Sequence, residues 1–168
     1  MTASAARPLG IRADLSLTDE QLAALARLAA FDLEPTRRAL RRGVLPAEWV
    51  DEAVFEFRRF VGLHIVADEP FAMVCQAVDE VWHTCLLSTR LYARLCEHTL
   101  GCFLHHRSAA AESEDGGDDD EPELPDSPSG YHVFARQYQR TYGPLTRMWK
   151  FPVLWWDPKR AHLYRPAS

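Results

Sequence analysis

The chain has 168 residues, of which 47% are hydrophobic and 26% are charged. This length and balance predict one soluble globular domain that buries its own core without needing disulfide bonds. No segment interleaves basic with aromatic side chains, which argues against a nucleic-acid-binding platform. The net charge is −5, and nine acidic and no basic residues lie between Glu112 and Asp126, so the rest of the chain carries about +4.

The N-terminal segment and the lengths of the apolar runs indicate in which cellular compartment the protein is expected. Residues 1–16 lack the apolar centre of a secretion signal and are expected to form a flexible leader. No run approaches the ~18 apolar residues that a membrane span needs. We therefore expect a cytoplasmic protein with no membrane segment, whose four cysteines are thiols or metal ligands rather than disulfides.

Apolar residues recur at helical spacing through residues 17–107, which are expected to form the helical core. Thr18 opens a capping box that predicts a first helix over about 19–31. A proline suited to the first turn of a helix predicts a short second helix over about 35–42. A dense apolar stripe then predicts a third helix from about residue 46 to Gly62, where the glycine would end it.

Composition changes abruptly after the core. Residues 108–130 are mainly acidic, Gly, Pro and Ser, which predicts a disordered acidic loop. A last main helix is expected over about 131–142, and the aromatic tail that completes residues 131–168 is too apolar to lie free of the same domain. No alternating pattern predicts a sheet, so the fold class is all-α, a compact irregular bundle of about five to six helices.

The stretch Val74–His106 holds all four cysteines and four of the seven histidines. Asp79 and His83 are four residues apart and would project from the same face of a helix. In a single straight helix, Cys96 would point about 140° away from His83. We therefore expect a break at Ser88-Thr89, where either side chain can cap a second helix that folds back on the first.

This folding lets the polar side chains of the stretch meet, because Gly101 would end the second helix just before a His-His pair. Carboxylate, imidazole and thiolate are ligands of zinc, and also of iron or copper. The spacing matches no standard zinc or di-iron signature. The predicted metal ligands are Asp79, His83, Cys96, His105 and His106. The remaining cysteines are expected to be small buried hydrophobes, namely Cys75, Cys85 and Cys102.

A longer pattern runs through the same stretch: Val-Asp-x-x-Trp-His, a Leu-rich step with Thr, and then Tyr, Cys, Gly and His-His. Its positions are Val78, Asp79, Trp82, His83, Leu86, Thr89, Tyr92, Cys96, Gly101, His105 and His106. This run resembles the signature of the glycine-rich domain-containing protein-like family in its short bacterial form. The segments Phe55–His64 and Tyr138–Trp149 look like the flanks of that family, so the resemblance covers about residues 50–149. It implies a shared fold and site rather than a reaction, and Cys85 stands where many members have a histidine.

Two functions are compatible with these residues. In the first, the chain is a metal-binding helical protein, either a metal-dependent enzyme for a small molecule or a binding protein. In the second, it is a non-enzymatic protein-interaction module whose Asp, His, Cys and His side chains form a structural hydrogen-bond network. A basic cluster could then contact an acidic partner, although a solvated helix face is the commoner role of Arg37, Arg38, Arg41 and Arg42.

Overall fold

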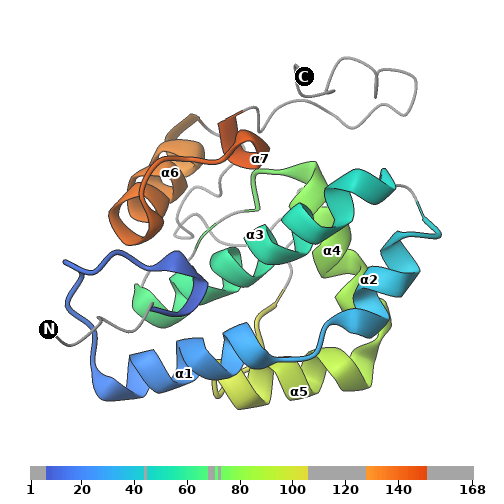
Figure 1. The fold of residues 1–168 in the computed structure, drawn as a ribbon, viewed down its shortest axis with the longest axis horizontal. Helices are drawn as coiled ribbons and strands as arrows, with labels where there is room; N and C mark the ends of the chain where they lie inside the picture. Colours follow the sequence, from blue (N-terminus) through green and yellow to red (C-terminus); the bar gives the residue numbers. More distant parts are fainter. Residues whose placement is uncertain (1–6, 44, 68–70, 72, 106–127, 151–168) are drawn as a thin grey trace, which may run out of the picture.

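A computed structural model describes residues 7–43, 45–67, 71, 73–105 and 128–150. In these residues the all-α fold class is confirmed, because the chain forms helices and no β-strand. Figure 1 shows α3 crossing the middle of the molecule, with α1 and α5 on one side and α6 and α7 on the other. The elements are the 3-10 turn η1 (Pro8–Gly10) and the helices α1 (Asp19–Ala30), α2 (Glu34–Leu40), α3 (Ala47–Val66), α4 (Gln76–Leu87), α5 (Thr89–Thr99), α6 (Pro128–Tyr142) and α7 (Arg147–Lys150).

The central helix α3 packs against α1, α2, α4 and α6. It continues to Val66, so the prediction that Gly62 ends it is wrong. A Cβ at this glycine would lie 2.5 Å from the hydroxyl oxygen of Tyr142 and 3.2 Å from the side chain of Leu25. The glycine therefore serves close packing in the middle of the helix rather than termination. The buried face of α3 carries Val50, Ala53, Val54, Glu56, Phe57, Phe60, Val61 and Leu63.

Helix α1 is held at both ends by side chains. At its start, the Thr18 hydroxyl accepts from the Gln21 amide at 3.1 Å and the Gln21 side chain accepts from the Thr18 amide at 3.0 Å, which confirms the predicted capping box. At its end, the guanidinium of Arg58 on α3 donates to the carbonyls of Leu28, Ala29 and Phe31. These bonds satisfy carbonyls that a helix end leaves without intrahelical partners.

The segment before α1 packs on the bundle. Leu9 and Ile11 belong to the hydrophobic core, with 7% and 5% of their surface exposed. The Arg59 side chain donates to the Leu9 carbonyl at 3.0 Å, and the Arg12 amide donates to the Thr141 carbonyl at 2.9 Å. Residues 7–16, expected as part of a flexible leader, are thus fastened to α3 and α6, while residues 1–6 lie outside the described part.

The break predicted at Ser88-Thr89 is confirmed, because α4 ends at Leu87 and α5 begins at Thr89. Its expected cause is wrong. The turn is made by the Ser88 backbone (φ −94°, ψ 64°), and the Ser88 side chain makes no capping hydrogen bond. At the far end of α5, Gly101 has φ +70° and its amide donates to the Cys96 carbonyl at 3.0 Å, so the predicted terminator is confirmed.

Helices α6 and α7 cover α3 on the side away from α5 (Figure 1). Because α6 begins at Pro128, it includes the last residues of the predicted acidic loop. The rest of that loop, 108–127, and the tail after Lys150 lie outside the described residues. Phe134, Tyr138 and Trp149 from these helices are fully buried. Across the described ranges, none of the helices combines the length and apolar character that a membrane crossing requires.

Candidate functional site

The predicted site begins with the exposed face of α4. Asp79 and His83 lie one turn apart on this helix, and Nδ1 of His83 is 3.6 Å from Oδ2 of Asp79. Their side chains are 26% and 46% exposed, so the pair faces solvent while Val78, Val81 and Trp82 on the same helix point inward. The prediction that this acid and this imidazole project from the same helix face is confirmed, and the structure shows that this face is accessible.

Cys96 has a different environment. It is 3% exposed on the inner side of α5, and its thiol lies near the Tyr92 hydroxyl. Burial raises the pKa of the Tyr92 hydroxyl, and the neighbouring Cys96 raises it further. This phenol consequently remains protonated, and so remains a hydrogen-bond donor, throughout the physiological range.

The Tyr92 hydroxyl joins three elements. It accepts a hydrogen bond from the indole N–H of Trp82 on α4 at 2.9 Å and donates one to the backbone carbonyl of Leu104, beyond the end of α5. The ring of Phe103 packs edge-on against Tyr92, with 5.1 Å between ring centroids. We call these four residues, Trp82, Tyr92, Phe103 and Leu104, the Tyr92 cluster.

The predicted terminal histidines follow Leu104 of the Tyr92 cluster directly in the chain. His105 is exposed, and its ring packs edge-on against Phe103 with a centroid separation of 5.0 Å. His106 lies outside the described residues. Of the predicted ligands, the structure therefore brings Asp79 and His83 together, whereas Cys96 lies near Tyr92 and His105 packs against Phe103.

The described residues do not bring the predicted ligands together as a metal centre. No group of three or more His, Cys, Asp or Glu side chains in it is arranged to hold a metal ion. The convergence of Asp79, His83, Cys96 and His105 on one ion is not seen there. The complete five-residue set, which includes His106, stays a prediction.

Comparison with known protein families finds a match. A family model described as UCP032817-like matches residues 33–121, which is more than half of the chain. The chain belongs to the UCP032817-like family. The matched residues include α2 to α5, the Asp79–His83 pair and the whole Tyr92 cluster. No curated protein and no solved structure matches the chain.

The four cysteines of this UCP032817-like protein are all free thiols. Burial raises the pKa of both Cys75 and Cys85 to about 11, so both are protonated, and their prediction as small buried residues is confirmed. Cys85 also lies 3.4 Å from the hydroxyl of Thr36 on α2. Cys102 is exposed, so the prediction that it is buried is wrong; it follows Gly101 in the turn, outside any helix.

Sequence reasoning missed a buried carboxylate in this UCP032817-like chain. Glu56 is 1% exposed, and its Oε2 accepts hydrogen bonds from the Tyr138 hydroxyl at 2.7 Å and the Trp149 indole at 2.6 Å. Arg59 lies 3.3 Å from its other oxygen and also donates to Tyr138 at 2.7 Å. A signal was present, because Glu56 stands three residues after Ala53 and four before Phe60, inside the apolar stripe. We call Glu56, Arg59, Tyr138 and Trp149 the Glu56 cluster.

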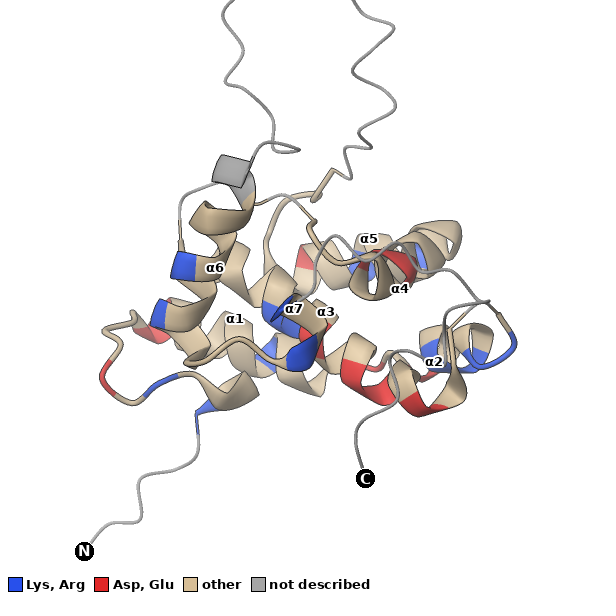
Figure 2. Cartoon of the chain, turned by 90° about the horizontal axis from the view of Figure 1, so that it is seen from above, with Lys and Arg blue, Asp and Glu red and all other residues tan. Residues whose placement is uncertain are grey.

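Three of the four arginines of the basic cluster at α2 form ion pairs within the fold. Figure 2 shows acidic residues beside the basic ones at α2. Arg37 and Arg41 both contact Asp51, at 3.2 and 3.3 Å, and Arg38 contacts Glu34 at 3.3 Å. These contacts favour the solvated, ion-paired face over a docking surface for an acidic partner.

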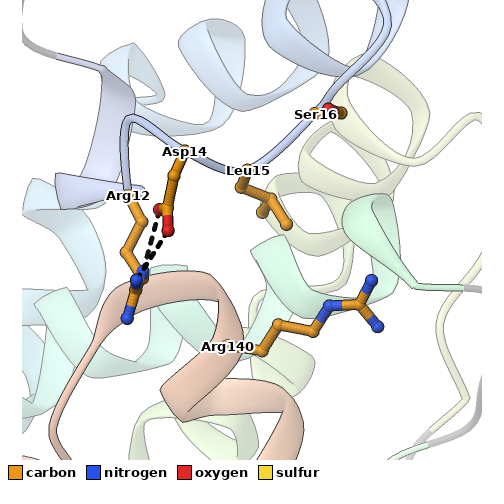
Figure 3. Close-up of a pocket in the computed structure, with 5 residues that line it drawn as sticks. All are labelled: Arg12, Asp14, Leu15, Ser16 and Arg140. Carbon is orange, nitrogen blue, oxygen red and sulfur yellow. Dashed lines mark hydrogen bonds and ion pairs between the residues drawn. The ribbon is translucent and has the colours of Figure 1, made fainter.

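A surface pocket lies away from the predicted site, between the segment before α1 and helix α6 (Figure 3). It has a volume of about 400 Å³ and is lined by Arg12, Asp14, Leu15, Ser16 and Arg140. Arg12 already donates to both carboxylate oxygens of Asp14, at 2.9 and 2.6 Å. The side chains around it are mostly exposed, and none belongs to the predicted ligand set.

Proposed function

We propose that this chain is a metal-binding helical protein in which Asp79 and His83 supply the first two ligands. The histidine pair after α5, His105 and His106, would complete the set. Zinc is the favoured ion, with iron or copper as the alternatives, because a carboxylate combined with imidazoles suits these metals. The observation that carries the proposal is the accessible Asp79–His83 pair with its 3.6 Å separation.

That separation fits a shared ion. Two ligand atoms bonded at about 2.1 Å to a tetrahedral metal lie about 3.4 Å apart, close to the spacing between His83 Nδ1 and Asp79 Oδ2. A charged hydrogen bond between an imidazole and a carboxylate would normally be nearer 2.8 Å. The pair is therefore spaced more like two ligands of one ion than like a direct hydrogen bond.

The proposed ligand set is narrower than the one predicted from sequence. Cys96 is buried beside the Tyr92 hydroxyl, whereas the side chains of Asp79, His83 and His105 reach solvent. We therefore assign Cys96 to packing around Tyr92 rather than to the metal. We also propose that the run from Val78 to His106 is the motif of the glycine-rich domain-containing protein-like family, whose shared feature would then be this metal site.

Elemental analysis of purified protein tests the proposal. We expect about one equivalent of a transition metal in the wild type and a loss of most of it in His83→Ala. The matched control is His98→Ala, because His98 is also an exposed histidine on a neighbouring helix but is outside the proposed set. Less than about a tenth of an equivalent in the wild type after loading with zinc would overturn the proposal.

A second candidate function is a protein-interaction module without metal. The observation that favours it is the Tyr92 cluster, in which two polar residues of the motif, Trp82 and Tyr92, are engaged in structural hydrogen bonds. This candidate predicts that a chelator leaves the melting temperature unchanged. The metal proposal predicts that a chelator lowers it by several degrees, since removal of a ligand that binds only the folded state is destabilising.

A further inference from the structure

The segment before α1, residues 7–16, crosses the bundle, and we call it the strap. The strap and α6 are far apart in the chain, yet both are fastened to α3, and the Arg12 amide of the strap donates to the Thr141 carbonyl of α6. We infer that the strap and α6 form one latch, which closes over a single turn of α3, Arg59–Gly62, and opens as a unit while α1 to α5 stay folded. The inference does not depend on the proposed metal site.

The guanidinium of Arg59 is shared by the strap and α6. Its Nε donates to the Leu9 carbonyl of the strap at 3.0 Å, and its Nη1 donates to the Tyr138 hydroxyl of α6 at 2.7 Å. The same group lies over the ring of Tyr142, 5.0 Å from the ring centroid. Because only 14% of the Arg59 side chain is exposed, release of either partner leaves a largely buried donor without its acceptor. One planar group therefore couples the two parts of the latch.

Gly62 gives the same two parts a common packing place. A Cβ at this position would lie 2.5 Å from the hydroxyl oxygen of Tyr142 and 3.5 Å from the side chain of Leu9. The Tyr142 hydroxyl also donates to the Arg59 carbonyl at 2.9 Å. The strap and the end of α6 thus pack against one turn of α3 at which each lies beside the other, so movement of one removes packing from the other.

The strap is held in a strained conformation. Leu9 has φ +58°, a left-handed backbone that leucine rarely adopts, and Gly10 follows with φ +72°. Such a backbone persists only where its surroundings impose it, and here the burial of Leu9 and the bond from Arg59 do so. The Arg7 side chain ties the ends of the strap together by donating to the Leu15 carbonyl at 2.6 Å. Loss of the Arg59 bond therefore releases the strap as a whole.

Opening of the latch changes the surroundings of Glu56. In the closed state Glu56 is 1% exposed, and its carboxylate accepts from the Tyr138 hydroxyl of α6. Departure of α6 removes this donor, and water must replace it at the ion pair of Glu56 with Arg59. The latch is thus a conformational device that decides when a buried charge pair of α3 meets solvent.

Native-state amide hydrogen exchange of the full chain at low urea concentrations tests the latch. In the wild type we expect the Ile11 amide of the strap and the slowest-exchanging amides of α6 to share one protection factor and one urea dependence, below the protection of α5. Leu9→Ala should lower the protection of the strap and of α6 by the same factor, at least about 30-fold, as for a truncated core leucine.

Leu40→Ala is the matched control. Leu40 is also a buried leucine, 3% exposed, at the end of α2, which packs on α3 and α4. Its truncation should lower the protection of α5 and leave that of the strap and α6 unchanged, because α2 is folded whether the latch is closed or open.

Tyr142→Phe tests the latch from the side of α6, and it keeps the test valid if Leu9→Ala does not fold. Removing one buried hydrogen bond should lower the protection of α6 about fivefold, and, since coupling is reciprocal, the Ile11 amide should lose the same factor. Tyr92→Phe is its control, because the Tyr92 hydroxyl also donates to a backbone carbonyl, that of Leu104, and its removal should leave the Ile11 amide unchanged.

Two results would overturn the inference. Wild-type protection of α6 in Leu9→Ala, or of the Ile11 amide in Tyr142→Phe, would show that the strap and α6 open independently. An equal loss of protection at the strap, α6 and α5 in Leu40→Ala would show that the strap and α6 open only when the whole chain unfolds.

Discussion

The Glu56 cluster and the Tyr92 cluster both contain buried polar side chains in an apolar bundle, and they differ in what they connect. The Glu56 cluster is charged, lies inside the core, and joins α3 to α6 and α7. The Tyr92 cluster is neutral and joins α4 and α5 to an exposed turn. Phe60 lies between them, with ring contacts to Trp82 at 5.3 Å and to Trp149 at 6.4 Å.

The Glu56 cluster is therefore expected to stabilise the whole fold, whereas the Tyr92 cluster is expected to hold one exposed turn in place. A buried carboxylate must be satisfied by hydrogen bonds, and Glu56 has donors at both of its oxygens. Removing its charge would leave buried donors without an equivalent acceptor, so the cost falls on the whole fold. The Tyr92 hydroxyl supports only one turn on its outer side, so its removal should affect that turn more than global stability.

The largest expected effect comes from Glu56→Gln, which should lower the free energy of unfolding by about 3 kcal/mol, in the range seen when one member of a buried ion pair is removed. The physical reason is that the amide nitrogen of Gln is itself a donor and would face Arg59 or the Tyr138–Trp149 pair. Urea unfolding followed by tryptophan fluorescence measures the change.

Glu52→Gln is the control for that substitution. Glu52 stands one turn earlier on the same helix and pairs with Arg147 at a more exposed site, where loss of an ion pair costs about 0–1 kcal/mol. Equal destabilisation by the two variants would contradict the claim that burial makes the Glu56 cluster special.

How much of this could be predicted from sequence depends on the range of the interaction. The Thr18–Gln21 capping box, the break at Ser88-Thr89 and the common face of Asp79 and His83 are set within a few residues, and all three were predictable. Gly62 was misinterpreted because its role is set by Tyr142, which is distant in the sequence.

The same dependence on distance along the chain explains which parts of the candidate site could be predicted from the sequence. Two of the partners of Glu56, Tyr138 and Trp149, lie 82 and 93 residues away in the chain, so spacing rules cannot identify them. The bridge from Trp82 through Tyr92 to Leu104 spans only 10 and 12 residues, but it needs the turn after α5 to fold back. The prediction of Cys96 as a ligand rests on residue type and on the folding back of the second helix, whereas the direction of its side chain depends on the packing of α5, which places it beside Tyr92.

A smaller effect is expected for the energetic coupling within the Tyr92 cluster. A double-mutant cycle of Trp82→Phe and Tyr92→Phe should give an interaction energy of about 1 kcal/mol, as for one buried neutral hydrogen bond. The cycle cancels the loss of indole volume, which the single Trp82→Phe variant also measures. Additive effects of the two substitutions on the free energy of unfolding would show that this hydrogen bond contributes nothing to stability.

The smallest expected effect is the contribution of His64 to the pH dependence of the free energy of unfolding. It tests whether the surroundings of the His64 ring next to Phe60 exclude water. The His64 ring lies against Phe60 and Phe71, and burial lowers the pKa of His64 below its usual 6.5, while the bond to the Phe60 carbonyl opposes this shift. Because the unfolded chain takes up this proton first as the pH falls, the associated stability is present above pH 6.5 and is lost as the pH falls through the folded-state pKa. The free energy of unfolding of His64→Gln, measured between pH 7 and pH 5, should therefore fall less steeply than that of the wild type, and His98→Gln controls for the substitution itself. A wild-type slope in His64→Gln would show that burial between Phe60 and Phe71 does not hold the pKa of His64 below its usual value.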